Sequence, residues 1–182
     1  GMMIIVGITR KSGVFEYLAI KSAKLARGNP LYILLIFSLI TAVASALLDN
    51  VTTVLLMVPV TFAITYRLGV SPIPFLMAEI LASNIGGTAT LIGDPPNIMI
   101  GSAVGLGFMD FVYNLTLPII VILIVTMGLL LLIYRKSLHA DPSHIQEIMA
   151  MDETETIKDW AILKKSLFVL ALTILGFIMH QS

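Results

Sequence analysis

The sequence predicts an all-α protein that crosses a membrane several times. Of its 182 residues, 58% are hydrophobic and only 12% are charged, and this charged fraction is about half that of an ordinary soluble domain. The mean hydropathy is +0.99. A soluble fold of this size could not bury so much apolar surface. The composition therefore excludes a soluble enzyme, a disordered tail and a nucleic-acid-binding protein.

The basic residues fall in a few short segments, at residues 10–27, at Arg67 and at residues 135–165. Lys and Arg in short loops mark the cytoplasmic side of a membrane protein, so we expect all three segments there. Residues 13–27 combine apolar and basic side chains and predict an amphipathic helix at the cytoplasmic interface. The chain contains no cysteine, which excludes disulfides and thiolate metal sites.

The segment 30–66 contains a single charged residue, Asp49, and lies between Arg27 and Arg67. Because both of its ends should be cytoplasmic, it must form a hairpin of two helices with its turn at Asp49 and Asn50. The first arm would be about 27 Å long at 1.5 Å per residue. That length fits a hairpin that crosses the membrane twice, and it also fits one that enters and returns without emerging.

The segment 74–105 predicts a crossing that is broken in its middle. Gly86-Gly87, Gly93 and Pro95-Pro96 interrupt its helical pattern. The two halves, at residues 74–85 and 95–105, would each be about 17 Å long, so only together could they span a bilayer. Irregular backbone at membrane depth is tolerated only inside protein or beside a wet cavity, and it forms the ion and substrate sites of many secondary transporters.

The rest of the chain is simpler. Residues 113–134 carry no charge and are long enough to span the bilayer, returning from an outer loop at residues 105–112. Residues 135–160 predict a polar cytoplasmic linker with a short helix after Asp141. Residues 161–182 begin another outward span. Both ends of the chain lie in apolar runs, so we interpret the chain as part of a longer membrane protein.

Polar side chains concentrate at the hairpin turn and at the interruption. The last carbonyls of the first half-helix would attract a cation, and the first N–H groups of the second half would attract an anion. At the turn, the Ser, Asp and Asn oxygens and the terminal carbonyls would suit Na⁺ or a proton carrier. The candidate ion- or substrate-binding residues are Ser45, Asp49, Asn50, Thr52, Thr53, Asn84, Gly86, Gly87, Thr88, Thr90, Gly93, Asp94 and Asn97.

Several of these residues also have simpler interpretations. Asp94 could serve only as the N-cap of the second half-helix, and Asp49 could lie in an exposed turn. Gly86 and Gly87 could allow close helix packing. Glu79, inside the first half-helix, could reach an interface or a polar neighbour.

Two motifs resemble a known family. They are LDNVTTVLLMVPVT (residues 48–61) and ASNIGGTATLIGDPPNIMIG (residues 82–101), and they are similar to the arsenical pump, sodium–proton antiporter and melanosomal P-protein permeases. These belong to the ion transporter superfamily, which also holds citrate and dicarboxylate carriers and shares the citrate-transporter-like domain. The resemblance implies that residues 1–134 are the first of two inverted repeats, with a re-entrant hairpin and a broken helix near mid-membrane. Residues 161–182 would begin a second, truncated repeat.

The resemblance also carries expectations about ligands. It implies cation coordination, with Na⁺ as one candidate, by Ser45, Asp49, Asn50 and the Gly86–Gly87 backbone. The dicarboxylate carriers have Ser-Asn-Thr at the hairpin tip, where this chain has Asp49, Asn50 and Val51. Asp94 stands where those carriers usually have Thr or Ser. The added negative charge repels a di- or tricarboxylate and suits a cation, a proton, or a neutral or weakly anionic oxyacid such as arsenite.

We therefore expect a secondary transporter of an ion or a small inorganic anion, similar to arsenite-efflux permeases or Na⁺/H⁺ antiporters, in the cell (inner) membrane. It would work by alternating access coupled to H⁺ or Na⁺, with Asp49 and Asp94 as the protonatable or cation-binding pair. The alternatives are a passive anion channel on the same scaffold and a citrate or dicarboxylate carrier. We expect no enzymatic activity and no cofactor other than the coupling ion. The expected partners are the lipid bilayer, the small-ion substrate, the second repeat of the same chain and a second copy of the protein.

Overall fold

The computed structural model describes Ile8, residues 13–150 and residues 159–179. The predicted all-α membrane fold class is confirmed, because all regular structure in these residues is helical and three helices are long and apolar enough to cross a membrane. The beginning of the predicted first repeat, the linker residues 151–158 and residues 180–182 lie outside the described residues. The helices are α2 (Val14–Leu25), α3 (Pro30–Leu47), α4 (Asn50–Leu68), α5 (Ile73–Gly87), α6 (Pro95–Val104), α7 (Phe108–Tyr134), α8 (Pro142–Ala150) and α9 (Trp160–Met179).

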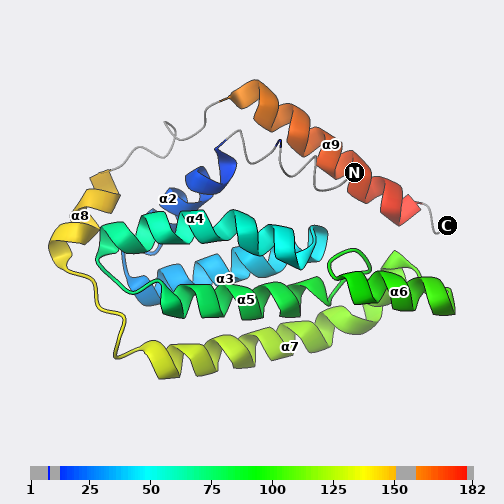
Figure 1. Ribbon diagram of the computed structural model, residues 1–182, viewed down its shortest axis with the longest axis horizontal. Coiled ribbons are helices and arrows are strands. Elements are labelled where there is room, and N and C mark those ends of the chain that lie inside the picture. Colours follow the sequence, from blue (N-terminus) through cyan, green and yellow to red (C-terminus); the bar gives the residue numbers. More distant parts are fainter. Residues whose placement is uncertain (1–7, 9–12, 151–158, 180–182) are drawn as a thin grey trace.

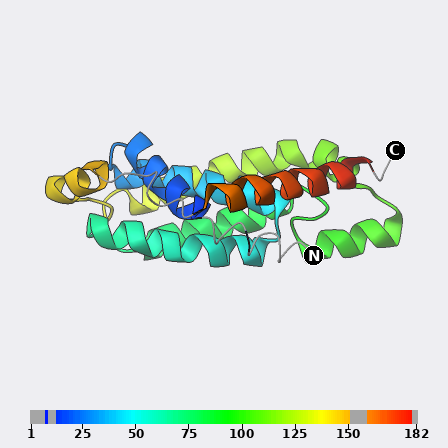
Figure 2. The same ribbon diagram turned by 90° about the horizontal axis from the view of Figure 1, so that it is seen from above.

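Helices α3, α4, α5 and α7 lie side by side along the long axis of the molecule (Figure 1). Helices α3 and α4 form an antiparallel hairpin whose tip lies where α5 ends, and α6 continues beyond that tip. Seen from above, the molecule is elongated and flat (Figure 2). The hairpin tip is thus placed beside the junction of α5 and α6 and not beyond the end of the molecule.

Described parts of the predicted basic segments gather at the opposite end of the molecule: α2, the end of α4 with Arg67, and the stretch from residue 135 to the end of α8. There α2 packs against α3, α4 and α8, and Arg27, Arg135 and His139 line one cavity of about 850 Å³. Helix α8 follows Asp141, whose carboxylate accepts hydrogen bonds from the backbone N–H and the hydroxyl of Ser143, and these bonds lower the pKa of Asp141. The cytoplasmic location of this end stays a prediction.

The hairpin has a clear local origin in the sequence. Asn29 caps α3 by accepting a hydrogen bond from the N–H of Leu31 at 3.0 Å, with Pro30 in the first turn. Asp49 caps α4 in the same way through the N–H of Thr52, at 2.8 Å. At the other end of α4, Gly69 adopts the left-handed conformation, with φ of 66°, which costs glycine little.

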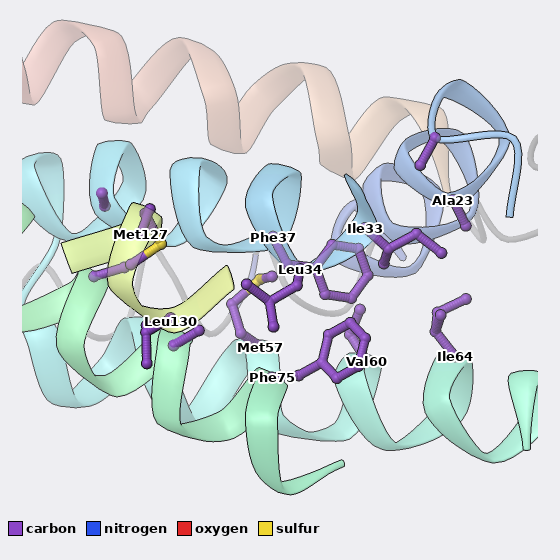
Figure 3. Close-up of a cluster of buried hydrophobic side chains, with 14 of the residues drawn as sticks. Ala23, Ile33, Leu34, Phe37, Met57, Val60, Ile64, Phe75, Met127 and Leu130 are labelled. Carbon is purple, nitrogen blue, oxygen red and sulfur yellow. The ribbon is translucent and has the colours of Figure 1, made fainter. Parts of the chain in front are cut away.

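The most extensive helix contact joins α3 and α5. On α5 the small residues Ala78, Ala82 and Gly86 repeat every fourth position and are buried. Small residues let two helices approach closely, which matters in a membrane because lipid is as apolar as the protein core. The large side chains of this core are Ile33, Leu34 and Phe37 of α3, Val60 and Ile64 of α4, and Phe75 of α5 (Figure 3).

Two predicted boundaries need correction. Helix α5 continues through Gly86 and Gly87, so the interruption covers residues 88–94 and does not start at the glycine pair. The intrinsic cost of glycine in a helix is about 1 kcal/mol, and packing against α3 outweighs it. Helix α7 begins at Phe108 and not at residue 113, because the Asp110 carboxylate accepts the N–H of Gly107 at 2.7 Å and stabilises an earlier first turn.

Candidate functional site

The hairpin tip contacts the interrupted segment through Asn50. Its backbone N–H donates to the carbonyl of Gly93 at 3.2 Å. Its side-chain amide donates to the Asp94 carboxylate at 3.1 Å and to the Asn84 side-chain oxygen at 3.2 Å. Asn84 belongs to the end of α5, whereas Asp94 directly precedes α6. One amide at the tip of the hairpin therefore joins both halves of the broken helix.

A second contact lies one helical turn below the tip. The Ser45 hydroxyl of α3 donates to the carbonyl of Ser83 at 2.8 Å, and the Ser83 hydroxyl lies 3.0 Å from both the Ser45 hydroxyl and the carbonyl of Asn50. Both serines are buried. Their bonds hold the end of α3, the start of α4 and the last turns of α5 together.

The interrupted segment is itself held by polar side chains. The Thr90 hydroxyl donates to the carbonyl of Ala46 at 2.5 Å and accepts the N–H of Gly93 at 3.1 Å. The Asn97 amide, from the first turn of α6, donates to the carbonyls of Thr88 and Thr90 at 3.1 and 2.9 Å. These bonds replace the helical ones that the segment lacks, as buried backbone requires.

The two predicted aspartates have different partners. Asp49 caps its own helix through Thr52. Asp94 occupies the N-cap position of α6 but makes no side-chain cap bond, and its carboxylate instead accepts from Asn50. Both side chains are half-buried. The Asp94 side chain therefore bonds to the hairpin tip and does not cap α6, whereas the position of Asp49 is accounted for by its capping bond.

The glycines are required by close backbone contacts. A Cβ atom on Gly86 would overlap the backbone of Ala42 in α3, and one on Gly93 would lie 2.7 Å from the carbonyl of Ser45. The Gly86 carbonyl already accepts the N–H of Ala89 at 3.0 Å. Gly87 would place a Cβ atom 3.1 Å from the Ser45 hydroxyl. The packing interpretation thus holds for Gly86. Of the oxygens predicted to surround Na⁺, the Gly86 carbonyl and the Ser45 hydroxyl are already hydrogen-bonded within the protein.

The start of α6 has fewer free N–H groups for an anion than the sequence predicts. Pro95 and Pro96 fill the first two helical positions and have no N–H to donate. The N–H of Asn97 is bonded to the carbonyl of Asp94 at 3.0 Å. The Asp94 carboxylate adds negative charge at the same place. The first three helical positions of α6 therefore offer an anion no free backbone N–H.

The remaining candidates lie around this contact. The Thr52 N–H is used by Asp49, and the Thr88 hydroxyl donates to the carbonyl of Asn84 at 2.8 Å. The Thr53 hydroxyl is buried and has no hydrogen-bond partner among the described residues. In the described part of the chain there is no cluster of three or more His, Asp or Glu residues that could hold a metal ion. Cation binding at this site would thus depend on amide, hydroxyl and carbonyl oxygens together with Asp94.

Sequence reasoning missed three participants: Ser83, the carbonyl of Ala46, and the pair formed by Thr61 and Glu79. Ser83 precedes Gly87 by one helical turn, on the face that contacts the hairpin, and that spacing is a usable signal. Nothing in the local sequence singles out a backbone carbonyl such as that of Ala46. Glu79 does reach a polar neighbour, as one interpretation held, because Thr61 of α4 donates a hydrogen bond to its carboxylate.

Known proteins are similar to this chain over most of its length. The family model described as Citrate transporter matches residues 1–182. A 46 kDa membrane protein of Mycobacterium leprae is 50% identical over 98% of the chain, and an uncharacterized transporter of Mycobacterium tuberculosis is 50% identical over 99%. The chain covers 42% of the length of each. The human P protein is 43% identical over 81% of the chain, which covers 18% of that protein.

Proposed function

Because the chain belongs to the citrate transporter family, a family of membrane transporters, we propose that it forms part of a secondary active transporter whose solute binds between the hairpin tip and the interrupted helix. The solute is an ion or a small inorganic oxyacid. Its movement is coupled to H⁺ or Na⁺, and access to the site alternates between the two sides of the membrane.

The observation that carries the proposal is the Asn50 bridge between Asn84 and Asp94. A polar loop and a broken helix are costly inside an apolar bundle, and they persist where they line a binding site. The bridge is made only of side chains, so a solute can replace it without unfolding either helix. Asn84 is exposed, and Asn50 and Asp94 are half-buried, so the site is accessible.

The negative charge of the site supports a cation, a proton or a neutral oxyacid as the transported solute. Asp49 and Asp94 flank Asn50 in the sequence and across the contact, and no basic residue occurs between residues 68 and 134. A solute bound here would therefore meet carboxylate and amide oxygens. A neutral hydroxylated solute could donate hydrogen bonds to them, whereas a free carboxylate would be repelled.

A citrate or dicarboxylate carrier is the second candidate, and the family description favours it. The two candidates differ in the charge of the solute that the site accepts. Uptake of citrate that exceeds uptake of arsenite or of Na⁺ would support the carboxylate carrier and refute our assignment of the solute class. Flux that never saturates and responds to no ion gradient would support a passive channel.

The test is an uptake assay in proteoliposomes that contain the full-length protein. Arsenite, Na⁺, chloride and citrate are offered separately, under imposed pH and Na⁺ gradients. We expect saturable uptake of arsenite or of Na⁺, driven by the pH gradient or by the Na⁺ gradient. We further expect Asp94→Asn to reduce uptake by 10-fold or more, because it removes the carboxylate from the site.

Asp110→Asn is the matched control for Asp94→Asn. Asp110 has the same charge but is exposed in the first turn of α7, where its carboxylate accepts the N–H of Gly107. Equal loss of uptake in both variants would show that the effect is not specific to the site. Unchanged uptake in Asp94→Asn would refute the role of Asp94.

A further inference from the structure

Glu79 is a buried acid that the proposed solute site does not use. Its side chain in α5 has no exposed surface. It faces α4, where the Thr61 hydroxyl donates a hydrogen bond to Oε1. The other oxygen, Oε2, is buried and has no hydrogen-bond partner among the described residues. Among the acids whose side chains are described, this is the only one that is fully buried.

The surroundings of this carboxyl contain no described cation that pairs with it. Helix α5 packs against α3, α4 and α7, whose titratable or charged residues are Tyr32, Tyr66, Arg67, Asp110, Tyr113 and Tyr134. Tyr32, Tyr66 and Tyr113 are exposed. Arg67 lies about 9 Å further along α4 than Thr61 at 1.5 Å per residue. Among the described residues, the hydrogen-bond partner found for Glu79 is Thr61.

A carboxylate with one donor in such surroundings is unfavourable. Burying an unpaired charge costs several kcal/mol after relaxation, of the order known for broken buried ion pairs. Addition of a proton at Oε2 removes that charge, and Oε1 can still accept the Thr61 hydrogen bond. On α3 and α4, the helices that pack against α5, the buried hydroxyls of Ser38, Thr41 and Thr65 bond to carbonyls of their own helices.

The carboxyl is also connected to the solute site by position. Ser83 lies one turn further along α5 on the same face, and its hydroxyl holds the carbonyl of Asn50. Thr61 belongs to the second arm of the hairpin. The Glu79 carboxyl therefore lies where α5 contacts α4. Separation of α4 from α5 would affect both this carboxyl and the solute site.

From this geometry we propose that Glu79 is the proton-binding site of the transporter, and that it releases its proton only when α4 and α5 separate enough to admit water. On binding, H⁺ adds to Oε2 and the carboxylate becomes a neutral acid. On release, the proton passes to water and the negative charge stays on the carboxylate. This inference rests on the proposed function, since it names the coupling ion as H⁺.

Infrared spectroscopy of the full-length protein in lipid tests the proton site without requiring transport. The C=O stretch of a protonated carboxylic acid is distinct from the bands of a carboxylate. We expect such a band at neutral pH, its loss in Glu79→Gln, and a shift in its frequency in Thr61→Val. Thr65→Val, which removes a hydroxyl bonded only to backbone, should leave the band unchanged. Absence of the band, or its persistence in Glu79→Gln, would overturn the proposal.

Coupling is tested in proteoliposomes with the same variants. Wild-type uptake should accelerate under a pH gradient, whereas Glu79→Gln should take up solute at one rate with and without the gradient. A full response to the gradient in Glu79→Gln would overturn the proposal. If Glu79→Gln does not fold, the band shift in Thr61→Val decides the matter. Failure of the wild-type protein to transport any solute would refute the proposed function, while the infrared result would still decide whether Glu79 holds a proton.

Discussion

The broken helix carries two acids in opposite surroundings. Asp94, at the start of α6, is half-buried in a cluster of amides and hydroxyls and bonds to the hairpin tip. Glu79, in the middle of α5, is sealed between helices with one hydrogen-bond donor. Asp94 has polar partners and lies partly exposed, whereas a charge on Glu79 would be buried with a single hydrogen-bond donor among the described residues. Solute binding and proton binding would thus occupy two different places along one element.

The difference also separates two kinds of helix contact. The Asn50 amide joins the tip to Asn84 and Asp94 by side-chain hydrogen bonds that a solute can replace, beside one backbone bond from the Asn50 N–H to the Gly93 carbonyl. The α3–α5 contact is joined by small residues and backbone proximity, which nothing soluble can replace. The bridge would therefore open during transport while α3 and α5 stay together. Substitutions in the two regions should therefore differ in whether they mainly affect stability or uptake, and in the size of the effect.

The largest expected effect is on the rigid contact. Gly86→Ala would drive a methyl group into the backbone of Ala42 and force α3 away from α5. We expect a loss of about 1–3 kcal/mol in the free energy of unfolding, as for other overpacked cores, together with loss of uptake. Chemical unfolding in detergent micelles followed by circular dichroism measures the first quantity.

Gly128→Ala in α7 is the control for this substitution. Beyond the backbone of its own helix and its chain neighbours, no described atom lies within 4 Å of a Cβ atom placed there, and alanine is the better helix former by up to about 1 kcal/mol. We expect unchanged or increased stability. The same loss in both variants would show that close approach to Ala42 is not what the first glycine provides.

The next effect concerns the bridge. Asn50→Ala removes the amide that bonds both Asn84 and Asp94. Each bond contributes about 0.5–1.5 kcal/mol, so we expect a loss of about 1–3 kcal/mol and a stronger loss of uptake. A double-mutant cycle with Asp94→Ala should give a coupling energy of about 0.5–3 kcal/mol. Additive effects would mean that the two residues do not interact in the membrane.

The smallest effect distinguishes the two aspartates. Asp49→Ala removes the cap of α4 and should cost about 1 kcal/mol of stability, whereas Asp49→Asn keeps an oxygen for the Thr52 N–H and should cost little. Asp94→Ala removes no cap bond, so it should lower uptake much more than it lowers the stability of α6. Thermal unfolding and uptake measured on the same preparations compare the three variants. A larger stability loss for Asp94→Ala than for Asp49→Ala would contradict the assigned roles.

Much of the architecture could be predicted from local sequence signals. The lone charge of Asp49 in an apolar segment located the hairpin turn, and Gly93 with Pro95-Pro96 located the interruption. Gly86 misled the prediction of the helix end, because its conformation depends on packing against Ala42 in another helix. The partners of Ser83 and Glu79 lie on other helices, Glu79 and Thr61 being 18 residues apart. Hydropathy cannot pair side chains across helices that are distant in the sequence.

The most direct test of the central claim, that the hairpin tip packs beside the interruption, is a disulfide between Ser45→Cys and Ser83→Cys. The two hydroxyl oxygens are 3.0 Å apart, so cysteine sulfurs at these positions need only a small side-chain rotation to reach the S–S distance of about 2.05 Å. The chain has no other cysteine. A protease site placed in the loop at residues 69–72 lies between the two positions. The variant is oxidised mildly in membranes and then cleaved at that site. We predict that the two fragments stay joined until a reductant is added. In the control pair Ser38→Cys and Ser83→Cys, the first cysteine lies about two helical turns before residue 45, and the fragments should separate. Fragments that separate without reductant in the first pair would contradict the account.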